Sequence, residues 1–302
     1  MTPAISVIML TYNREMLVSH AIESVLAQTF SDFDYIIVDN GSSDRSGAIA
    51  DEYAERDRRI RVIHRERGSI GGGRNTGLNA ARGEYIAFVD DDDLCEPDYL
   101  MFLYKLAVDN NADVSICSVT GKEFNDIEIM VAEKAIIELL WRKKYNAGFP
   151  TKLIRHSLFK GNLFVEESRY DDIYLMPRIL AKANRIAYHG VPKYTANRHD
   201  NNNSAWTSNH TLITPKILSE YLSVYRTRTV WLCECYPNSA AEWRYFEWSF
   251  MISMVEKVNR LELSACYQIR DNLIAELREH RDEFINGDFT LDFEKNWMEL
   301  YV

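Results

Sequence analysis

The sequence lacks the features of a membrane-spanning or secreted protein. No apolar run approaches the length of a membrane span, and the apolar stretch 4–10 is too short for a signal peptide and has no basic residues before it. The five cysteines are odd in number and have no zinc-ligand spacing, which favours reduced thiols over a disulfide framework. We therefore expect a cytoplasmic protein whose contact with a membrane, if it has one, is peripheral and at the inner face.

A basic surplus is also missing. The chain carries 35 Lys and Arg residues against 45 Asp and Glu residues, which leaves a formal net charge of -10 at pH 7. This balance argues against a nucleic-acid-binding protein that relies on contacts with the phosphate backbone, so we expect no nucleic-acid partner. What the chain does have is 46% hydrophobic residues over 302 positions, enough to bury the core of one large domain, or of one domain with an appendage.

Apolar runs alternate with helical patterns along the first part of the chain. The runs predict buried strands at residues 4–10, 35–38, 60–64, 85–89 and 114–117. Helical spacing of apolar residues predicts helices at residues 17–26, 44–56 and 97–110. Strands that alternate with helices of this length indicate right-handed crossovers and a Rossmann-like, doubly wound, mainly parallel sheet. The predicted fold class is therefore α/β.

The pattern changes in the second part of the chain. We expect a helix over 128–145, a loop over 149–161, a helix over 173–183 that Pro177 kinks or restarts, and short strands at 186–189 and 193–196. Three long helical patterns follow, near 212–235, 239–260 and 264–286, and predict a helical appendage. Its aromatic residues are expected to pack inward, with a sugar-stacking platform as the alternative. They include Trp231, Trp243, Tyr245 and Trp248.

Four consecutive carboxylates, Asp90 to Asp93, follow the predicted strand 85–89. Ligands of open α/β sheets bind beyond the carboxyl ends of the strands, and carboxylates this close need a cation or several donors to offset their repulsion. Oxygen ligands suit Mg²⁺ or Mn²⁺, so a metal-bound diphosphate is the leading interpretation. For Asp93 alone, the alternative is a cap on the next helix. A calcium loop of the EF-hand kind is excluded, because Leu94 and Cys95 stand where it needs an oxygen ligand and a glycine.

Four segments together resemble the family 2 glycosyltransferases with the GT-A fold. They are SVIMLTYNRE, IIVDNGSSD, GGGRNTGLNAARGEYIAFVDDDD and RYDDI, which occur in this order between residues 4 and 205. The resemblance implies a GT-A domain over residues 1–205, with a nucleotide-sugar half at about 1–117 and an acceptor half at about 118–205. It says nothing of residues 206–302, which we expect to form the helical C-terminal region.

The resemblance also implies which residues bind the nucleotide-sugar. They are Thr11, Tyr12, Asn13, Asp39, Arg74, Asp90, Asp91 and Arg198. Asp39 is expected to accept a hydrogen bond from the imide N–H of uracil, which favours a UDP-sugar donor. A cap on the turn after it is the alternative for Asp39, and a cap on the first helix is the alternative for Asn13. The cofactor is expected to be Mn²⁺ or Mg²⁺. Its implied ligands are Asp92, Asp90 and His199.

The acidic pair Asp171 and Asp172 matches the family's catalytic motif at the start of a helix. The resemblance makes Asp172 the general base of an in-line displacement that inverts the anomeric carbon. Acceptor contacts are expected from Asp171, Lys152 and Trp206. The ordinary alternative for the acidic pair is a favourable interaction with the helix dipole. This hypothesis requires Asp92 and Asp172 to line one cleft.

The expected function is the transfer of a single hexosyl or N-acetylhexosaminyl group from a UDP-sugar. The acceptor would be a carbohydrate or a lipid-linked glycan, in surface polysaccharide biosynthesis. Polymerising relatives carry membrane spans and a Gln-x-x-Arg-Trp motif, and this chain has neither. One alternative is a sugar nucleotidyltransferase, but TYNRE stands where that enzyme needs a glycine-rich basic loop. The other is a non-catalytic nucleotide-sugar-binding scaffold. The C-terminal helices leave open a peripheral membrane contact or a homo-oligomer.

Overall fold

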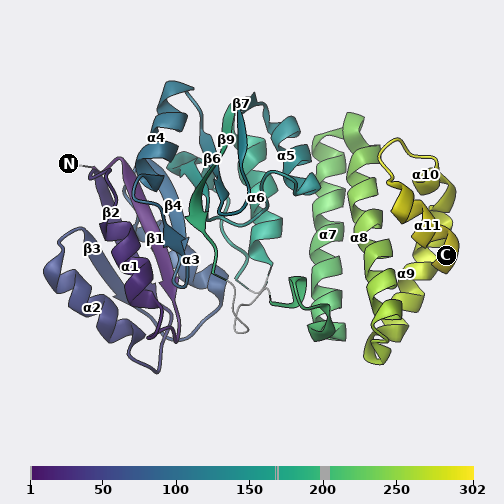
Figure 1. Cartoon of the computed structure of the whole chain (residues 1–302), viewed down its shortest axis with the longest axis horizontal. Helices are drawn as coiled ribbons and strands as arrows, with labels where there is room; N and C mark the ends of the chain where they lie inside the picture. The colour runs from purple at the N-terminus through teal and green to yellow at the C-terminus, as the bar shows by residue number, and fades with distance from the viewer. Residues whose placement is uncertain (1, 167, 169, 198–204) are drawn as a thin grey trace. The chain divides into compact units, whose positions relative to one another are not determined.

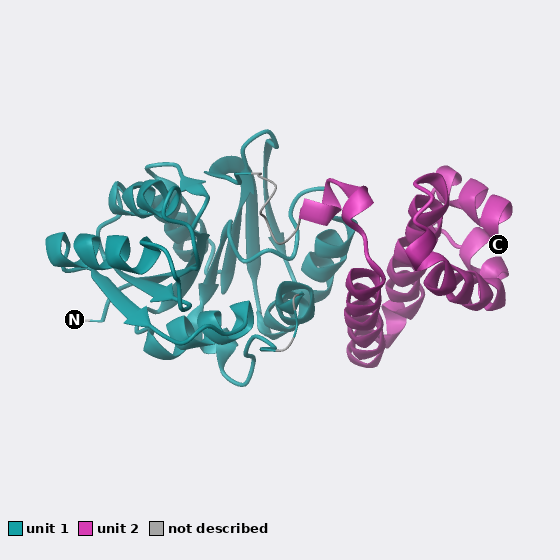
Figure 2. Cartoon of the chain, turned by 90° about the horizontal axis from the view of Figure 1, so that it is seen from below, with its two compact units in different colours: residues 1–197 teal, residues 198–302 magenta. Residues whose placement is uncertain are grey.

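The structure is a computed structural model of the chain, and it describes residues 2–166, 168, 170–197 and 205–302. The chain divides into two compact units, Met1–Asn197 and Arg198–Val302, which Figure 2 colours separately. The first unit is an α/β domain and the second consists of helices (Figure 1). The predicted fold class, a mainly parallel sheet with a helical C-terminal region, is confirmed, while the exact domain boundary at residue 205 stays a prediction.

The sheet of the first unit begins with four parallel strands. These are β1 (Ile5–Thr11), β2 (Phe33–Asp39), β3 (Ile60–His64) and β4 (Tyr85–Asp90), in the spatial order β3-β2-β1-β4. The order continues through β8 (Lys152–Arg155), β6 (Val114–Val119), β9 (Ile186–Thr195) and β5 (Leu94–Cys95), and β7 (Phe124–Met130) lies beside β9. β8 runs antiparallel between β4 and β6, whereas β6 and β9 are parallel.

Helices cover both faces of this sheet because side chains alternate along each strand. Ile5, Val7 and Met9 of β1 belong to one core together with residues of α1 (Val18–Leu26), α2 (Ser46–Arg56) and α4 (Tyr99–Asp109). Ile8 and Leu10 point to the other face, where α3 (Ile70–Ala80) packs on β1. Further along, α5 (Ala132–Trp141) packs on α6 (Asp171–Lys182), which runs as one helix through Pro177.

Three of the described strands were not predicted. β8 lies in the predicted loop 149–161, β5 lies between the predicted strand 85–89 and the predicted helix 97–110, and β7 begins before the predicted helix 128–145 and reaches into it as far as Met130. β8 has only four residues, and its partners β4 and β6 are distant in the sequence, so no local pattern distinguishes it from a loop. The two short strands predicted at 186–189 and 193–196 form the single strand β9.

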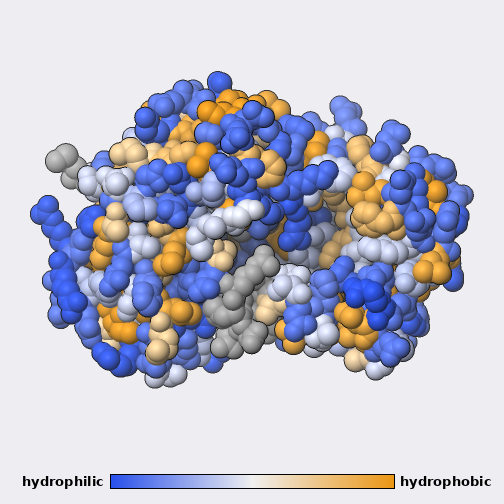
Figure 3. Space-filling model, in the orientation of Figure 1, coloured by the Kyte–Doolittle hydropathy of each residue, from blue (hydrophilic) through white to orange (hydrophobic). Residues whose placement is uncertain are grey.

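β7 places apolar side chains on the surface. Phe124, Ile127 and Ile129 are 37%, 54% and 40% exposed on this strand, which pairs with β9 outside the main strand order. Figure 3 shows apolar side chains gathered at the upper edge of the first unit, over β7 and α4, on an otherwise mostly hydrophilic face. The predicted helix 128–145 contains α5, and only its first residues, up to Met130, belong to β7 instead.

The second unit is built from helices with an aromatic core. Its helices are α7 (Pro215–Cys235), α8 (Ala240–Arg260), α9 (Tyr267–Glu279), α10 (Arg281–Ile285) and α11 (Asp292–Tyr301). Thr214 caps α7 by accepting a hydrogen bond from the N–H of Ile217 at 3.2 Å, and Pro215 follows it at the first helical position. Trp243, Tyr245 and Trp248 are buried, which confirms their predicted packing, whereas Trp231 is only partly buried. The last helix, α11, was not predicted.

Short 3₁₀ turns complete the described structure, at His156–Phe159, Ala205–Thr207, His210–Leu212, Pro237–Ser239 and Ser264–Cys266. All five cysteines are free thiols, as their number and spacing predicted. In the part of the chain that the structure describes, no helix is both long enough and apolar enough to cross a membrane.

Candidate active site

The four parallel strands end side by side in polar residues. Thr11 at the end of β1 is paired in register with Asp39 at the end of β2, and Asp39 is paired with His64 at the end of β3. On the other side of β1, Asp90 ends β4 opposite Leu10. Because parallel strands end at the same edge of a sheet, these side chains share one edge, where open α/β sheets bind their ligands.

Asn13 ties the loop after β1 to the loop after β2. Its Oδ1 accepts a hydrogen bond from the N–H of Ser43 at 2.8 Å, and its own N–H donates to Oγ of Ser42 at 3.1 Å. Helix α1 begins without a side-chain cap, so the alternative of a helix-capping Asn13 is wrong. Next to it, the guanidinium of Arg67 lies 4.6 Å from the ring centroid of Tyr12 and covers that ring.

Asp39 is buried and hydrogen-bonded through both carboxylate oxygens. Oδ1 accepts from the N–H of Ser42 at 3.0 Å, and Oδ2 lies 3.0 Å from Nδ1 of His64. Burial alone would raise the pKa of Asp39, but the hydrogen bonds from Ser42 and His64 outweigh it and lower the pKa. Asp39 therefore does cap the turn that follows β2, which was the alternative role expected for it. Each oxygen still has a lone pair for a second donor.

The carboxylates after β4 are held from the loop after β1. The N–H of Tyr12 donates to Asp91 at 3.2 Å, and Nε of Arg14 lies 3.8 Å from a carboxylate oxygen of Asp91 and 3.9 Å from one of Asp92. Both carboxylates thus face the loop that the resemblance assigns to the nucleotide. The sequence analysis did not single out Arg14, although its place directly after TYN in the strand-end loop was a usable signal.

Asp93 has a different role from its neighbours. Its Oδ1 accepts a hydrogen bond from the backbone N–H of Asn197 at 2.7 Å, which fastens the segment after β9 to the end of β4. Helix α4 begins after Asp98, whose side chain makes no capping bond. The alternative of Asp93 as the N-cap of that helix is therefore wrong.

The electrostatics of these carboxylates favour a cation. Burial, with the like charges of its neighbours, raises the pKa of Asp91 to about 7, and burial together with Asp90 raises that of Asp93 to about 7. The pKa of Asp90 is also raised, first by loss of water and then by Asp92 and Asp172, against the lowering effect of Arg74. Carboxylates with raised pKa values, whose metal-binding atoms are all oxygens, fit a hard divalent ion.

Asp92 and Asp90 are the residues that could hold this ion. Among the described residues, no three His, Cys, Asp or Glu side chains come together as a metal-binding cluster. Mg²⁺ usually takes one or two protein carboxylates and fills the rest of its coordination shell with phosphate oxygens and water. The predicted ligand His199 and the predicted donor contact Arg198 lie outside the described residues.

Arg74 joins the strand-end carboxylates to the acidic pair. Its guanidinium lies 3.6 Å from Asp90 and 3.2 Å from Asp171, and helix α3, which carries it, is capped by Ser69. The next residue, Asn75, exchanges two hydrogen bonds of 3.0 Å with the backbone of Phe164 and so fixes the loop before α6. Carboxylates on two sides thus hold the head group of Arg74.

Asp171 and Asp172 begin helix α6. Asp171 is 3% exposed, and burial raises its pKa to about 6, with Arg74 opposing that rise and Asp172 adding to it. Asp172 is half-buried, and its Oδ1 accepts a hydrogen bond from the N–H of Ile173 at 2.8 Å. Because Arg74 lies 3.6 Å from Asp90 and 3.2 Å from Asp171, the acidic pair lies beside the strand-end carboxylates, while a cleft shared by Asp92 and Asp172 stays a prediction.

Two residues predicted to contact the acceptor have partners within the chain. Lys152 on β8 is fully buried and donates to the carbonyl of Gly148 at 2.5 Å. Trp206, in the second unit, is buried and stacks edge-on with Tyr221, with ring centroids 4.8 Å apart. These contacts account for both side chains without an acceptor, and their acceptor role stays a prediction.

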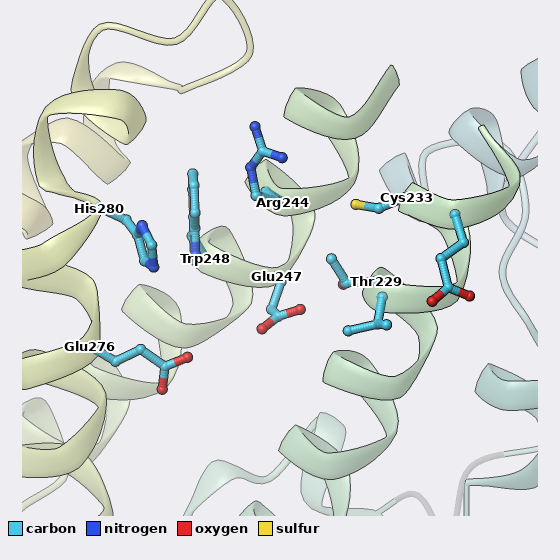
Figure 4. Close-up of a pocket in the computed structure, with 9 residues that line it drawn as sticks. Thr229, Cys233, Arg244, Glu247, Trp248, Glu276 and His280 are labelled. Atoms are coloured by element: carbon cyan, nitrogen blue, oxygen red, sulfur yellow. The ribbon is translucent and has the colours of Figure 1, made fainter. Parts of the chain in front are cut away.

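The second unit contains a cavity of about 450 Å³ between α7, α8 and the end of α9 (Figure 4). The described residues that line it are Thr229, Val230, Cys233, Glu234, Arg244, Glu247, Trp248, Glu276 and His280. Trp248 is only 5% exposed and stacks on His280, with ring centroids 4.7 Å apart, so its packing role prevails over a sugar-stacking platform. Since none of the predicted site residues lines this cavity, we place the chemistry at the strand ends of the first unit.

Comparison with known proteins agrees with the resemblance. The family model described as "Glycosyl transferase family 2" matches residues 6–166. The putative glycosyltransferase EpsH of Bacillus subtilis is 33% identical over 258 residues, which cover 80% of this chain and 72% of EpsH. The chain therefore belongs to glycosyl transferase family 2.

Solved structures show the same fold. The structure of S. aureus TarS 1-349 in complex with UDP-GlcNAc has a TM-score of 0.65 and 22% identity, over 93% of this chain and 78% of that one. The mannosyltransferase PcManGT from Pyrobaculum calidifontis, in complex with GDP-Man and Mn²⁺, has a TM-score of 0.63 and 15% identity, over 100% of this chain and 84% of that one. At these identities the likeness establishes the fold, which is the GT-A fold, with helices after it.

Proposed function

We propose that this chain is a metal-dependent, inverting glycosyltransferase that moves one hexosyl or N-acetylhexosaminyl group from a UDP-sugar to a carbohydrate or lipid-linked glycan. Membership of the family supplies the class of reaction. The observation that carries the rest is the position of Arg74, which bonds Asp171 and lies 3.6 Å from Asp90. Through it, the donor side and the base side of the proposed chemistry meet in one site.

The donor contacts follow from the strand ends. Thr11, Tyr12 and Asn13 border the nucleoside, and Asp39 accepts from the imide N–H of uracil through a lone pair that Ser42 and His64 leave available. Asp92, with Asp90, would hold Mn²⁺ or Mg²⁺, which when bound offsets the negative charge that develops on the departing diphosphate. The TarS complex with UDP-GlcNAc supports a uridine donor by analogy, and the GDP-Man complex of PcManGT makes this choice one to test.

The transfer is a single displacement at the anomeric carbon. Asp172 takes the proton of the acceptor hydroxyl as its oxygen forms the new bond to that carbon. The bond from the anomeric carbon to the diphosphate oxygen breaks on the opposite side, and UDP leaves with the bonding electrons. One displacement inverts the configuration, as in inverting glycoside hydrolysis. Arg74 contributes by holding Asp171, the neighbour of the base, in place.

The acceptor side is the less specified part of the proposal. Asp171, Lys152 and Trp206 are retained as acceptor-facing candidates, of which Asp171 is nearest to the base in sequence and is already bonded to Arg74. The transfer would be a step of surface polysaccharide biosynthesis. A cytoplasmic location, a peripheral membrane contact and self-association through the C-terminal helices are parts of the same proposal.

Asp172→Asn tests the proposal directly. We expect UDP binding to stay within about twofold of wild type and transfer to fall by about 10²- to 10⁴-fold, because the amide cannot take the acceptor proton. The measurement is single-turnover release of UDP from UDP-GlcNAc with a panel of glycan acceptors, together with calorimetric titration of UDP. Asp292→Asn is the matched control, since Asp292 also stands in the first turn of a helix.

Unchanged transfer by Asp172→Asn would remove Asp172 as the base. A non-catalytic scaffold would show no acceptor-dependent UDP release even in the wild type. A sugar nucleotidyltransferase would instead release pyrophosphate from UTP and a sugar phosphate.

A further inference from the structure

His64 lies between two carboxylates from different elements. It is the last residue of β3, in register with Asp39 at the end of β2. Its Nδ1 is 3.0 Å from Oδ2 of Asp39, and its Nε2 is 3.0 Å and 3.1 Å from the two oxygens of Asp51 on α2. Among the described residues, Asp39 from β2 and Asp51 from α2 are the charged groups that face this ring.

The protonation state of His64 follows from its partners. A neutral imidazole has one N–H, so it can donate to only one of the two carboxylates and turns a lone pair toward the other. The imidazolium donates to both. Consistent with this, the hydrogen bonds to Asp39 and Asp51 raise the pKa of His64, against a smaller lowering by burial. The charged form of His64 is the one that fits the observed geometry.

We infer that His64, as an imidazolium, is a positioning residue that orients the Asp39 carboxylate toward the base of the donor nucleotide. This inference rests on the proposed role of Asp39. With Oδ1 held by Ser42 and Oδ2 held by His64, the carboxylate cannot turn, and its remaining lone pairs point in set directions. An oriented acceptor selects a base whose ring nitrogen carries a proton, as in uracil, over cytosine, whose N3 is itself an acceptor.

Gly47 on α2 makes room for this pair. A methyl group at residue 47 would lie 2.6 Å from Oδ2 of Asp39 and 3.2 Å from Cε1 of His64. Replacing Gly47 with Ala would therefore displace the bonded pair without removing a charged group. This gives a test of geometry that is separate from the test of charge.

Two substitutions of His64 separate its two hydrogen bonds. In His64→Asn the amide nitrogen can take the place of Nδ1 and keep the bond to Asp39, whereas in His64→Gln it takes the place of Nε2 and keeps the bond to Asp51. We expect His64→Asn to bind UDP-GlcNAc within about twofold of wild type at neutral pH, and His64→Gln and Gly47→Ala to bind it about tenfold more weakly, as expected for a lost hydrogen bond to a charged group.

The pH dependence of UDP-GlcNAc binding tests whether the charged form of His64 is the one that acts. Wild-type affinity for UDP-GlcNAc, measured by calorimetry with Mg²⁺ from about pH 5.5 to about pH 8.5, should decline as His64 loses its proton, because the neutral ring must share its one N–H between Asp39 and Asp51. His64→Asn should lack that part of the decline, because its amide does not titrate, so the difference between the two profiles isolates His64 from other titrating groups. The preference for UDP over CDP should narrow in His64→Gln and remain in His64→Asn. Urea unfolding confirms that each variant is folded.

The outcomes distinguish this inference from the proposed function. If Asp39→Asn weakens UDP binding while all three of the other variants bind and titrate like wild type, His64 does not position Asp39, and the role of Asp39 stands. If Asp39→Asn itself leaves UDP binding unchanged, the proposed recognition of uracil fails, and the inference about His64 fails with it. Equal weakening by His64→Asn and His64→Gln would also overturn it.

Discussion

Lys152 is a fully buried lysine close to the acidic pair. Its amino group donates to the carbonyl of Gly148 at 2.5 Å and lies 3.5 Å from Oγ1 of Thr151. Burial lowers the pKa of Lys152 to about 8, against the opposing effects of Cys117 and Asp172. As a cation, the buried Lys152 therefore lowers the stability of the fold.

Lys152→Met tests this cost through pH. The unfolded chain holds the lysine proton up to the ordinary pKa of 10.5, whereas the folded chain releases it at about 8, so wild-type stability should rise between these values. Relative to Lys152→Met, wild type should gain about 3 kcal/mol from pH 7 to pH 10.5. Urea unfolding at both pH values measures it. Lys105→Met, at an exposed position of α4, should show no such change, and a constant difference between wild type and Lys152→Met would refute the assignment.

Arg74 shows how one side chain unites residues that the sequence keeps apart. Its partners Asp90 and Asp171 belong to β4 and α6, and the pKa of Arg74 is raised by Asp171, Asp90 and Asp172 although burial opposes this. The sequence analysis placed Arg74 near the nucleotide by resemblance. Its ion pair with Asp171 is an additional role, which depends on how the loop before α6 returns to α3.

Helix α3 approaches β1 so closely that it leaves no room for side chains at two positions. A methyl group at residue 73 would lie 2.2 Å from Cδ1 of Leu10, and one at residue 77 would lie 2.4 Å from Cγ2 of Ile8. This close approach keeps Arg74 beside the end of β4. Gly73 and Gly77 therefore position the site by letting α3 pack closely on β1, in addition to the turn that precedes this helix.

Gly77→Ala should destabilise the fold by about 1–3 kcal/mol, because the added methyl group overpacks the contact with Ile8. The same change should cost less in an Ile8→Ala background, where the opposing methyl group is gone. Chemical denaturation measures both. Asn79→Ala, on the exposed side of the same helix, should change stability by less than about 0.5 kcal/mol. Because alanine has a higher helix propensity than glycine or asparagine, a similar loss there would show that the loss at Gly77 does not report the contact with Ile8.

The whole protein is acidic, yet its proposed ligand is a diphosphate. The formal net charge of -10 and the carboxylates after β4 would repel an anion, so the donor should bind well only together with a divalent cation. A ligand that binds only the folded state stabilises it by mass action, by about 2.7 kcal/mol at a hundredfold excess over its dissociation constant. Binding is therefore measurable as a shift in melting temperature before the acceptor is known.

A thermal-shift panel of nucleotide-sugars should distinguish the donors. We expect UDP-sugars with Mn²⁺ to raise the melting temperature more than either component alone, and more than GDP-sugars or CDP-sugars with Mn²⁺. Asp92→Asn should lose the part of the shift that depends on Mn²⁺. Larger shifts with GDP-sugars would count against the role of Asp39, and metal-independent shifts would count against that of Asp92.

The sequence by itself determined the elements that carry the site. Period and run length located β1 to β4, and the polar residues that end them were recognised because each follows a buried strand. The order of the motifs then identified the family and its general base candidate. The strands and the family were predicted correctly because they depend on residues that are neighbours along the chain, while the general base stays a prediction.

Only the tertiary structure decided which of these residues meet. The bond of Arg74 to Asp171 spans 97 positions, and that of His64 to Asp39 spans 25. β8 pairs with β4 and β6, which lie far away in the sequence, and for that reason no local pattern predicted it. Such contacts arise when a whole sheet and its covering helices pack together, and the energy that selects them is spread over residues that no single segment contains.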